Sequence, residues 1–180
     1  MAGTDPVAVE LVDAMVDEVG KLYEPGLPMG SSATPSELSP PGGGFVVLWE
    51  GARAVAGGGL KRLGDVACEI KRMYVAPEAR GRGLGRALLA ALEDLARDLG
   101  YAVARLDTGA EQPGARRMYE RAGYESVPDY NGNPYAAWWG EKRLASGRGR
   151  AAPYRRTSPS RPYGGYSATF APRMGAEAEP

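Results

Sequence analysis

The chain has 180 residues, of which 43% are hydrophobic, and its 22 basic side chains balance 22 acidic ones. This length suits one domain with a core of its own and space for a tail. The sequence has no histidine and a single cysteine, Cys68, which excludes imidazole catalysis, an intramolecular disulfide and a multi-cysteine metal site. No apolar run is long enough to cross a bilayer and the N-terminus lacks the pattern of a signal peptide, so we expect a cytoplasmic protein without a metal or a membrane partner.

The first predicted element is a helix over residues 4–23. Asp5 can cap this helix, and Pro6 suits its first position. Apolar residues follow at spacings of three and four, which is typical of one buried helical face; they are Val12, Met15, Val16 and Val19. Residues 24–44 then have the Pro, Gly and Ser content of a long loop. A loop of this length inside a compact domain is often functional, so it is a candidate lid over a substrate.

Two β-rich runs follow in residues 45–63, and the Glu50-Gly51 pair that joins them predicts a hairpin. Three consecutive glycines, Gly57–Gly59, lie in the second run. They indicate a bulge or a close approach by another backbone or a ligand. A third strand is expected over residues 66–76, where a proline ends it.

The next part of the chain alternates helices and strands. A leucine at every third or fourth position predicts an amphipathic helix over residues 83–99, which Gly100 closes. Strands are expected over residues 101–108 and 136–144, with a short helix between them over residues 113–123. This order predicts an α/β (α+β) domain in which a mixed sheet is layered with helices.

The composition changes after Leu144. Residues 146–180 contain almost no aliphatic side chains, are dense in Pro, Gly and Ser, and carry six arginines against two glutamates. Such a segment cannot bury enough apolar surface to offset the entropy of ordering. We therefore expect a domain over residues 1–145 and a disordered, basic, low-complexity tail over residues 146–180. Arginines interleaved with tyrosines are the only feature of the tail typical of nucleic-acid binding, and we prefer a solvated appendage without that partner.

The stretch "VAPEARGRGLGRALL" joins the third predicted strand to the long helix. Glycines there let the backbone approach an anion, and N–H groups at a helix start point toward it, so the context suits a phosphate group. The P-loop motif fails because no lysine follows the glycines. The dinucleotide motif Gly-x-Gly-x-x-Gly fails because Arg86 or Leu88 stands at its last position. The pattern that remains is Arg80-x-x-Gly83-x-Gly85.

That pattern, after a strand and before a long helix, resembles the acetyl-CoA pyrophosphate loop of the GNAT superfamily of N-acetyltransferases. The resemblance extends over about residues 10–144. In it, "CEIKRMYVAPEARGRGLGRALL" is similar to the family's strand, loop and helix at the cofactor, and "QPGARRMYERAGY" to its later motif. The stretch "RLDTGAEQPGARRMYERAGY", with "PPGGGF" upstream, is similar to a bacterial small-molecule branch of the family. It implies the GNAT fold, a mixed and mostly antiparallel sheet flanked by helices. The family usually has a strand before its first helix, and only four residues precede Asp5, so either that strand is missing or the true start lies upstream.

The resemblance also implies a binding site for acetyl-CoA as the cosubstrate. The loop would hold the pyrophosphate through backbone N–H groups and guanidinium charge; its residues are Arg80, Gly81, Arg82, Gly83, Leu84, Gly85 and Arg86. The main chain of Met73, Tyr74 and Val75 would pair with the pantetheine arm like an added strand, and one N–H group there would stabilise the oxyanion. Gln112 stands where an asparagine of the family often touches the cofactor.

Two side chains are candidates for proton transfer. Tyr119 matches the general acid of the family, which protonates the departing thiolate, and the alternative is a core aromatic at helical spacing. Glu69, on the strand that meets the cofactor, is the best base candidate, and the alternative is an ion pair with Lys71 or Arg72. A free carboxylate titrates too low to take a proton from an ammonium group efficiently, so a base here needs a raised pKa or a water relay. Cys68 has no histidine to activate it and is expected to be a buried apolar residue.

These inferences predict an acetyl-CoA-dependent N-acetyltransferase. The acetyl group would pass directly, in a ternary complex, to a primary amine of a small molecule such as an amino acid or a polyamine. A protein lysine or N-terminal acetyltransferase is the first alternative, and an acyl-CoA-binding or RNA-binding module without catalysis is the second. Residues 24–44 and 129–135 would shape the acceptor pocket. The oligomeric state stays open between a monomer and a homodimer.

Overall fold

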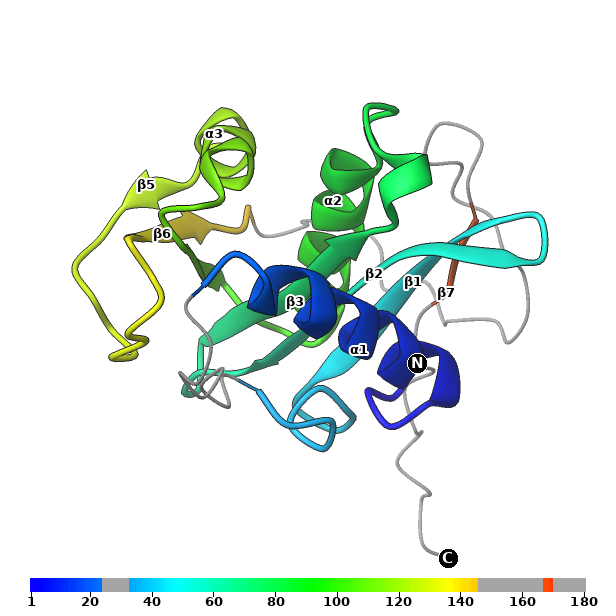
Figure 1. The fold of residues 1–180 in the computed structure, drawn as a ribbon. Helices are drawn as coiled ribbons and strands as arrows, with labels where there is room; N and C mark the ends of the chain where they lie inside the picture. The colour runs from blue at the N-terminus through cyan, green and yellow to red at the C-terminus, as the bar shows by residue number, and fades with distance from the viewer. Residues whose placement is uncertain (24–32, 146–166, 170–180) are drawn as a thin grey trace, which may run out of the picture.

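The computed structural model describes residues 1–23, 33–145 and 167–169, the last three by their backbone alone. Three α-helices, one short 3₁₀ helix and seven strands occur in this part of the chain (Figure 1). In chain order they are α1 (Pro6–Gly20), β1 (Gly44–Glu50), β2 (Arg53–Arg62), β3 (Ala67–Val75), η1 (Pro77–Ala79), α2 (Leu84–Asp98), β4 (Val103–Thr108), α3 (Pro113–Arg121), β5 (Glu125–Ser126), β6 (Trp138–Arg143) and β7 (Ser167–Thr169).

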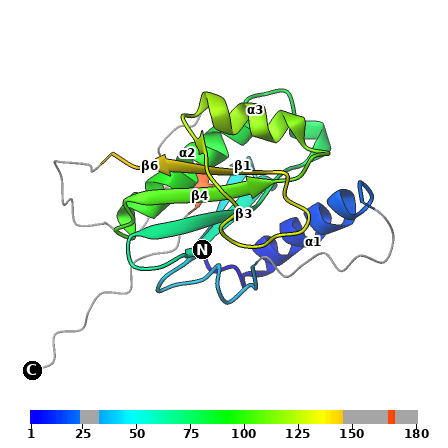
Figure 2. The same ribbon diagram turned by 90° about the vertical axis from the view of Figure 1, so that its left-hand side faces the viewer.

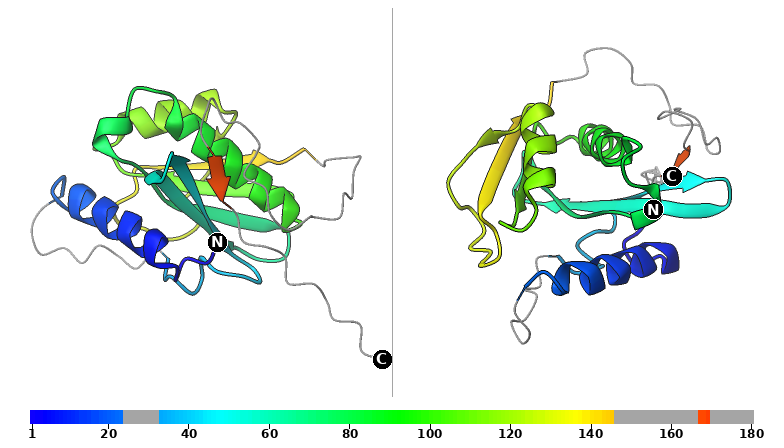
Figure 3. Two further views of the ribbon diagram at one scale, coloured as in Figure 1. Left: turned by 90° about the vertical axis from the view of Figure 1, so that its right-hand side faces the viewer. Right: turned by 45° about the horizontal axis from the view of Figure 1, so that its top comes forward.

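The strands form one sheet in the order β5-β6-β4-β3-β2-β1-β7. Every neighbouring pair is antiparallel except β3 and β4, which run parallel. Helix α1 covers one face of the sheet, and α2 and α3 cover the other (Figures 2 and 3). The predicted mixed, mostly antiparallel sheet flanked by helices is therefore confirmed.

Two apolar clusters fill the space between these layers. The larger one lies under α2 and contains the stripe of leucines that the sequence pattern predicts, with Leu84, Leu88 and Leu92 fully or almost fully buried. The smaller one lies under α1 and is built around Phe45 and Leu38. A sheet that buries apolar side chains on both faces needs helices on both faces, which is why the sheet is central in the fold.

Helix α1 begins where the sequence predicts. Asp5 is its N-cap and accepts a hydrogen bond from the Val7 N–H at 3.1 Å, and Pro6 follows in the first turn. The buried face differs in part from the prediction. It consists of Ala8, Leu11 and Met15. These residues are three and four positions apart and so lie on one side of the helix, the side that faces the sheet.

The hairpin of β1 and β2 also forms as predicted, with Gly51 at a positive φ of 59° in its turn. The glycines that follow allow close packing, because a Cβ atom on Gly57 would lie 2.7 Å from Leu11 Cδ1. A bulge accompanies them. Gly57 pairs with Tyr74 and Gly59 pairs with Lys71, so that two residues of β3 lie opposite the single glycine between these pairs.

The tail expected to have no structure differs from the expectation at three residues. Ser167–Thr169 form β7 and pair antiparallel with residues 47–49 of β1. Residues 1–5 form no strand, and only Met1 pairs with β1, through two backbone hydrogen bonds with Phe45. Beyond Phe45 the outer edge of β1 offers backbone N–H and C=O groups, and an edge of this kind is a template for another segment. Residues 146–166 and 170–180 lie outside the described part of the chain.

A membrane crossing would require a long, apolar helix. None of the helices within the described residues meets that requirement.

Candidate active site

The parallel strands β3 and β4 pair over only three residues. Their register runs from Ala67 opposite Val103 to Glu69 opposite Arg105, and no further pair of these strands follows. From Ile70 onward, β3 stays paired with β2 on one side only. The sheet therefore opens at this point, with a free backbone edge on the second half of β3.

A cavity of about 150 Å³ lies in this opening. Its walls come from α1 and the turn after it, from β3, from β4 and the loop after it, from α3, and from the loop before β6. The lining residues that the site depends on are Met15, Val19, Tyr23, Ile70, Lys71, Arg72, Met73, Asp107, Thr108, Gln112, Tyr119, Asn133 and Tyr135. Three predicted site residues are among them, Met73, Gln112 and Tyr119, whereas Glu69 is not.

Tyr119 reaches the cavity from α3. Only 7% of its surface is exposed, its ring stacks on that of Trp138 with centroids 6.4 Å apart, and its hydroxyl donates to Met73 Sδ at 3.7 Å. Burial raises the pKa of Tyr119 well above its ordinary value, and the negative charge of Asp107 raises it further. The hydroxyl therefore keeps its proton at any physiological pH.

Glu69 is 2% exposed and is enclosed by polar partners. Its carboxylate lies 3.3 Å from Lys71 Nζ and 3.6 Å from Lys61 Nζ. It also accepts hydrogen bonds from the Tyr130 hydroxyl at 3.1 Å and from Asn131 Nδ2 at 2.7 Å. The structure thus contains the ion pair with Lys71 that the sequence left open as the structural alternative, and the role of Glu69 as a base stays a prediction.

Asp107 is the carboxylate that lines the cavity, and the sequence analysis missed it. Its Oδ2 atom accepts from Lys71 Nζ at 2.7 Å, and its Oδ1 atom accepts from Asn133 Nδ2 at 3.2 Å. Asn131 also donates to it. One signal in the sequence could have identified it: an acidic residue near the carboxyl end of a strand, beside the strand expected to meet the cofactor.

The loop before β6 contributes to the cavity wall through part of its length. Tyr130 bonds Glu69 and is not among the lining residues, whereas Tyr135 lines the cavity and packs edge-to-face against Tyr23 at 5.4 Å between centroids. Thus the expectation that residues 129–135 shape an acceptor pocket agrees with the position of Asn133 and Tyr135. Of the other predicted wall, residues 24–32 lie outside the described residues.

The loop between η1 and α2 has the backbone that an anion site needs. Gly81 and Gly83 have positive φ angles of 74° and 81°, and Gly83 is the N-cap of α2. The helical hydrogen bonds begin with the Ala87 N–H donating to the Gly83 carbonyl. The N–H groups of Leu84, Gly85 and Arg86 precede that bond, so they are directed toward the loop.

Two residues at the start of α2 also have structural roles. The Leu84 side chain is buried in the core, so only its backbone can face a ligand. At Gly85, a Cβ atom would lie 3.0 Å from Met118 Sδ, so this glycine lets α2 and α3 approach each other. Gln112 occupies the N-cap position of α3 without a capping hydrogen bond from its side chain. Its amide oxygen accepts a hydrogen bond from Thr108 Oγ1 at 3.1 Å, which holds the amide at the cavity wall.

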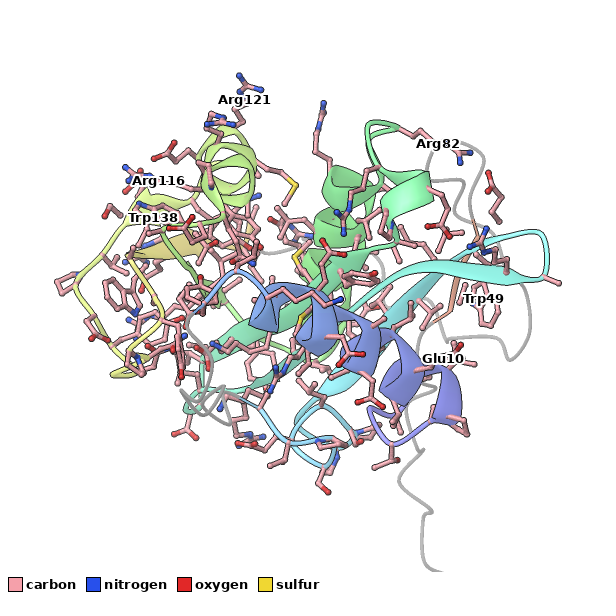
Figure 4. The ribbon with its side chains drawn as sticks, in the orientation of Figure 1. Glu10, Trp49, Arg82, Arg116, Arg121 and Trp138 are labelled. Carbon is pink, nitrogen blue, oxygen red and sulfur yellow. The ribbon has the colours of Figure 1, made fainter. Side chains whose placement is uncertain are left out.

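The arginines of the loop lie on the surface. Arg80 donates to the Val75 carbonyl at 2.9 Å and to Glu18 Oε2 at 2.7 Å, and Arg82 pairs with Glu50. Figure 4 shows Arg82 at the upper right and Arg116 and Arg121 of α3 at the upper left, with α2 between them. Because surface ion pairs are weak, a polyanion can compete for these guanidinium groups.

These features fit the cosubstrate that the sequence implies. The free β3 edge suits an extended amide chain, and the N–H groups at the start of α2 suit a pyrophosphate. Two other chemistries have less support. Burial raises the pKa of the Cys68 thiol to about 12, which removes its nucleophilic form. Within the described residues, no group of three or more Asp, Glu, Cys or His side chains is arranged to hold a metal ion.

Comparison with known proteins agrees with this architecture. Residues 12–124 match the model of the acetyltransferase (GNAT) family. An uncharacterized N-acetyltransferase of Escherichia coli K12, YjgM, is 37% identical over 90 residues, which are 48% of this chain and 52% of that protein. The IAA acetyltransferase of Azospirillum brasilense is 43% identical over 56 residues, or 31% of this chain and 37% of that one. The chain thus spans about half the length, or less, of the curated relatives it matches.

Solved structures show the same fold. A protein from Klebsiella pneumoniae that is described as an acyl-CoA N-acyltransferase superposes with a TM-score of 0.60 at 29% identity, over 80% of this chain and 94% of that chain. A GNAT acetyltransferase of Elizabethkingia anophelis, solved with acetyl-CoA bound, gives a TM-score of 0.51 at 18% identity over 68% and 95% of the two chains. With the family model matching more than half of its length and the opening between β3 and β4 in place, the chain belongs to the GNAT acetyltransferase family.

Proposed function

We propose that this protein is an acetyl-CoA-dependent N-acetyltransferase that transfers an acetyl group to the primary amine of a small molecule in a ternary complex. One observation carries the proposal: a single cavity is lined both by Met73 on the free edge of β3 and by the hydroxyl-bearing ring of Tyr119. A thioester carbonyl held along that edge would lie beside a protonated phenol.

The cosubstrate would be held from the end of β3 to the start of α2. Main-chain groups of residues 73–75 would pair with the pantetheine arm, and backbone N–H groups of the loop from Arg80 to Arg86 would bind the pyrophosphate. One N–H group of the β3 edge would donate to the oxyanion, an effect typically worth about 3–4 kcal/mol. Gln112 would contribute its amide at the cavity wall, where it already faces Thr108.

The proposed chemistry is direct acyl transfer. The neutral amine nitrogen attacks the thioester carbonyl carbon and a C–N bond forms. When the C–S bond then breaks, Tyr119 gives its proton to the departing thiolate and regains one from solvent. The elevated pKa of Tyr119 keeps the phenol protonated before each turnover, as an ordinary tyrosine would also be, and it makes the proton harder to transfer.

The proton that the amine loses needs a carboxylate acceptor. Glu69 is the base candidate from the sequence, because it lies on the strand expected to meet the cofactor. It is enclosed by two lysines, so it would need a water molecule to relay the proton. Asp107 lines the cavity and is the candidate that its position favours. Because both carboxylates contact Lys71, removal of either one changes the charge around the other.

The size of the cavity supports a small acceptor. About 150 Å³ accommodates a molecule of roughly the size of benzene. A protein lysine acetyltransferase would instead need a groove along which a peptide could lie. A panel of small amines and lysine-containing peptides, incubated with acetyl-CoA and followed by release of the coenzyme A thiol, tests the proposal. Thiol release with small amines is the expected result, and release with peptides alone would replace the proposal by its alternative.

A further inference from the structure

Arg72 has a backbone conformation that arginine rarely adopts. It lies in the β3 bulge, where it and Met73 are opposite the single glycine Gly58, and its φ angle is 59°. Among the residues of the described chain, it is the only one other than glycine with a positive φ. A glycine would adopt this conformation at no steric cost, so an arginine here points to a use for its side chain.

The Arg72 side chain lines the cavity between β3 and β4. Its Nε atom is buried and has no hydrogen-bond partner, and within residues 1–23 and 33–145 its guanidinium group forms no ion pair. Six other arginines of the described chain have acidic partners; these are Arg53, Arg80, Arg82, Arg97, Arg105 and Arg116. Among the described arginines without such a partner, only Arg72 has a buried nitrogen that forms no hydrogen bond.

The remaining charges at the cavity balance each other. Lys71 is held between Asp107 at 2.7 Å and Glu69 at 3.3 Å, so its charge is neutralised by the protein. The other walls near β3 and α1 are apolar and include Met15, Ile70 and Met73. Burial in these surroundings lowers the pKa of Arg72, and no neighbouring negative charge offsets this effect. An uncompensated cation in a cavity wall is a binding group for an anion.

We propose that Arg72 binds a carboxylate of the acceptor, so that the acceptor is an amino acid, a small molecule that carries both an amine and a carboxylate. This inference rests on the proposed acetyltransferase function and narrows its substrate class. The planar guanidinium fork matches a carboxylate with two parallel hydrogen bonds. Asp107, on the strand across the opening, lines the same cavity and is the carboxylate there that could accept the amine end of such a molecule. A polyamine, which has only cationic groups, would meet repulsion at this wall.

Matched pairs of acceptors test this inference. Each pair is an amino acid and its amide, which have nearly the same shape but differ in charge, and thiol release from acetyl-CoA is measured for both. The wild-type protein is expected to have a kcat/KM at least tenfold higher for the acid than for the amide. Aminoalkyl phosphates form a third arm, since a preference for them over the acids would overturn the choice of a carboxylate.

Arg72→Asn is the informative variant, because asparagine tolerates a positive φ and the fold should be kept. The preference for the acid is expected to disappear, mainly through KM, while the amide is acetylated as before. Arg72→Lys keeps the charge without the fork and should keep only part of the preference. Arg62→Asn is the matched control, at the exposed end of β2 and away from the cavity.

The outcomes distinguish a failure of the role of Arg72 from a failure of the acetyltransferase function. If wild type acetylates amides or plain amines as well as the acids, the role of Arg72 is overturned and the acetyltransferase function stands. An equal loss for acid and amide in Arg72→Asn overturns it as well, because the residue would then act on the fold or the cosubstrate. If no acceptor of any class releases thiol, the proposed function itself is overturned, and the inference with it.

Discussion

The hydroxyl of Tyr119 lies 3.7 Å from the sulfur of Met73, so a side chain of α3 touches the free edge of β3 across the opening in the sheet. Removing this hydroxyl should affect chemistry and not binding. We expect Tyr119→Phe to lower kcat by about 10²- to 10⁴-fold, the usual contribution of a general acid, with little change in the affinity for acetyl-CoA. Steady-state kinetics and calorimetric titration with acetyl-CoA measure the two quantities.

The pH dependence gives a second measurement on the same variant. Since burial raises the pKa of Tyr119 in the folded protein, the phenol stays protonated at a pH where an ordinary tyrosine, with a pKa near ~10, ionises. The kcat of the wild-type protein should therefore not fall as the pH rises toward ~10, the pKa of an ordinary tyrosine. A variant that retains the full kcat, or a wild-type rate that falls already near neutral pH, would remove Tyr119 from the role of the acid.

The glycine loop makes a separate prediction about the cosubstrate. Gly83 caps α2 with a positive φ, and a glutamate there would bring a negative charge and a strained backbone to the proposed pyrophosphate site. Gly83→Glu should abolish the thermal stabilisation that acetyl-CoA gives to the wild-type protein. Gly64→Glu is the matched control, since Gly64 also has a positive φ, of 96°, with open space around it, but lies between β2 and β3. Equal stabilisation of both variants by acetyl-CoA would refute the assignment of the loop.

Local rules account for most of the fold. The cap at Asp5, the hairpin turn at Gly51, the leucine stripe of α2 and the bulge beside Gly58 all follow from residue types whose conformational limits are strong. β5 was not predicted, because two exposed residues carry no periodic signal. β7 was not predicted either, since what holds it is the free edge of β1 and not its own composition.

The candidate site could be predicted only where it depends on the backbone. The glycine loop and the strand that leads into it were identified from their sequence. Asp107 was missed, and Glu69 was not recognised as enclosed, because both positions depend on where β3 and β4 separate. That point is set by long-range packing and not by any local pattern. Arg72 appears in the sequence as one of two adjacent basic residues, and only its φ angle and lack of a partner distinguish it from Lys71.

Asp107 and Glu69 can be compared directly as bases. We expect Asp107→Asn to lower kcat by about 10²- to 10⁴-fold, since Asp107 lines the cavity and a general base contributes that much. Glu69→Gln keeps the volume and the contacts with Tyr130 and Asn131, so its main effect should be lower stability from the loss of one partner of Lys71. Thermal melts and pH–rate profiles of both variants distinguish the roles. Loss of the acidic limb of the profile in Glu69→Gln alone would assign the base to Glu69.

The pairing of β7 with β1 predicts an effect of the tail on the domain. A chain that ends at residue 145 leaves the outer edge of β1 open beyond Phe45, and we expect its Tm to fall by roughly 2–4 °C, the shift that a loss of about 1 kcal/mol gives in a protein of this size. It should also self-associate more, because an open edge strand is a template for pairing, and light scattering detects this. A chain that ends at Thr169 keeps β7 and is the matched control, with an expected Tm equal to that of the full chain. Ala168→Pro in the full chain removes one backbone N–H from β7 and should reproduce the short chain. If all four proteins have the same Tm and stay equally dispersed, β7 adds nothing to the stability of the sheet. A separate gel-shift experiment with RNA tests the tail for binding. A salt-dependent shift that is lost in the shorter chain would give the tail the binding role that its arginines and tyrosines suggest.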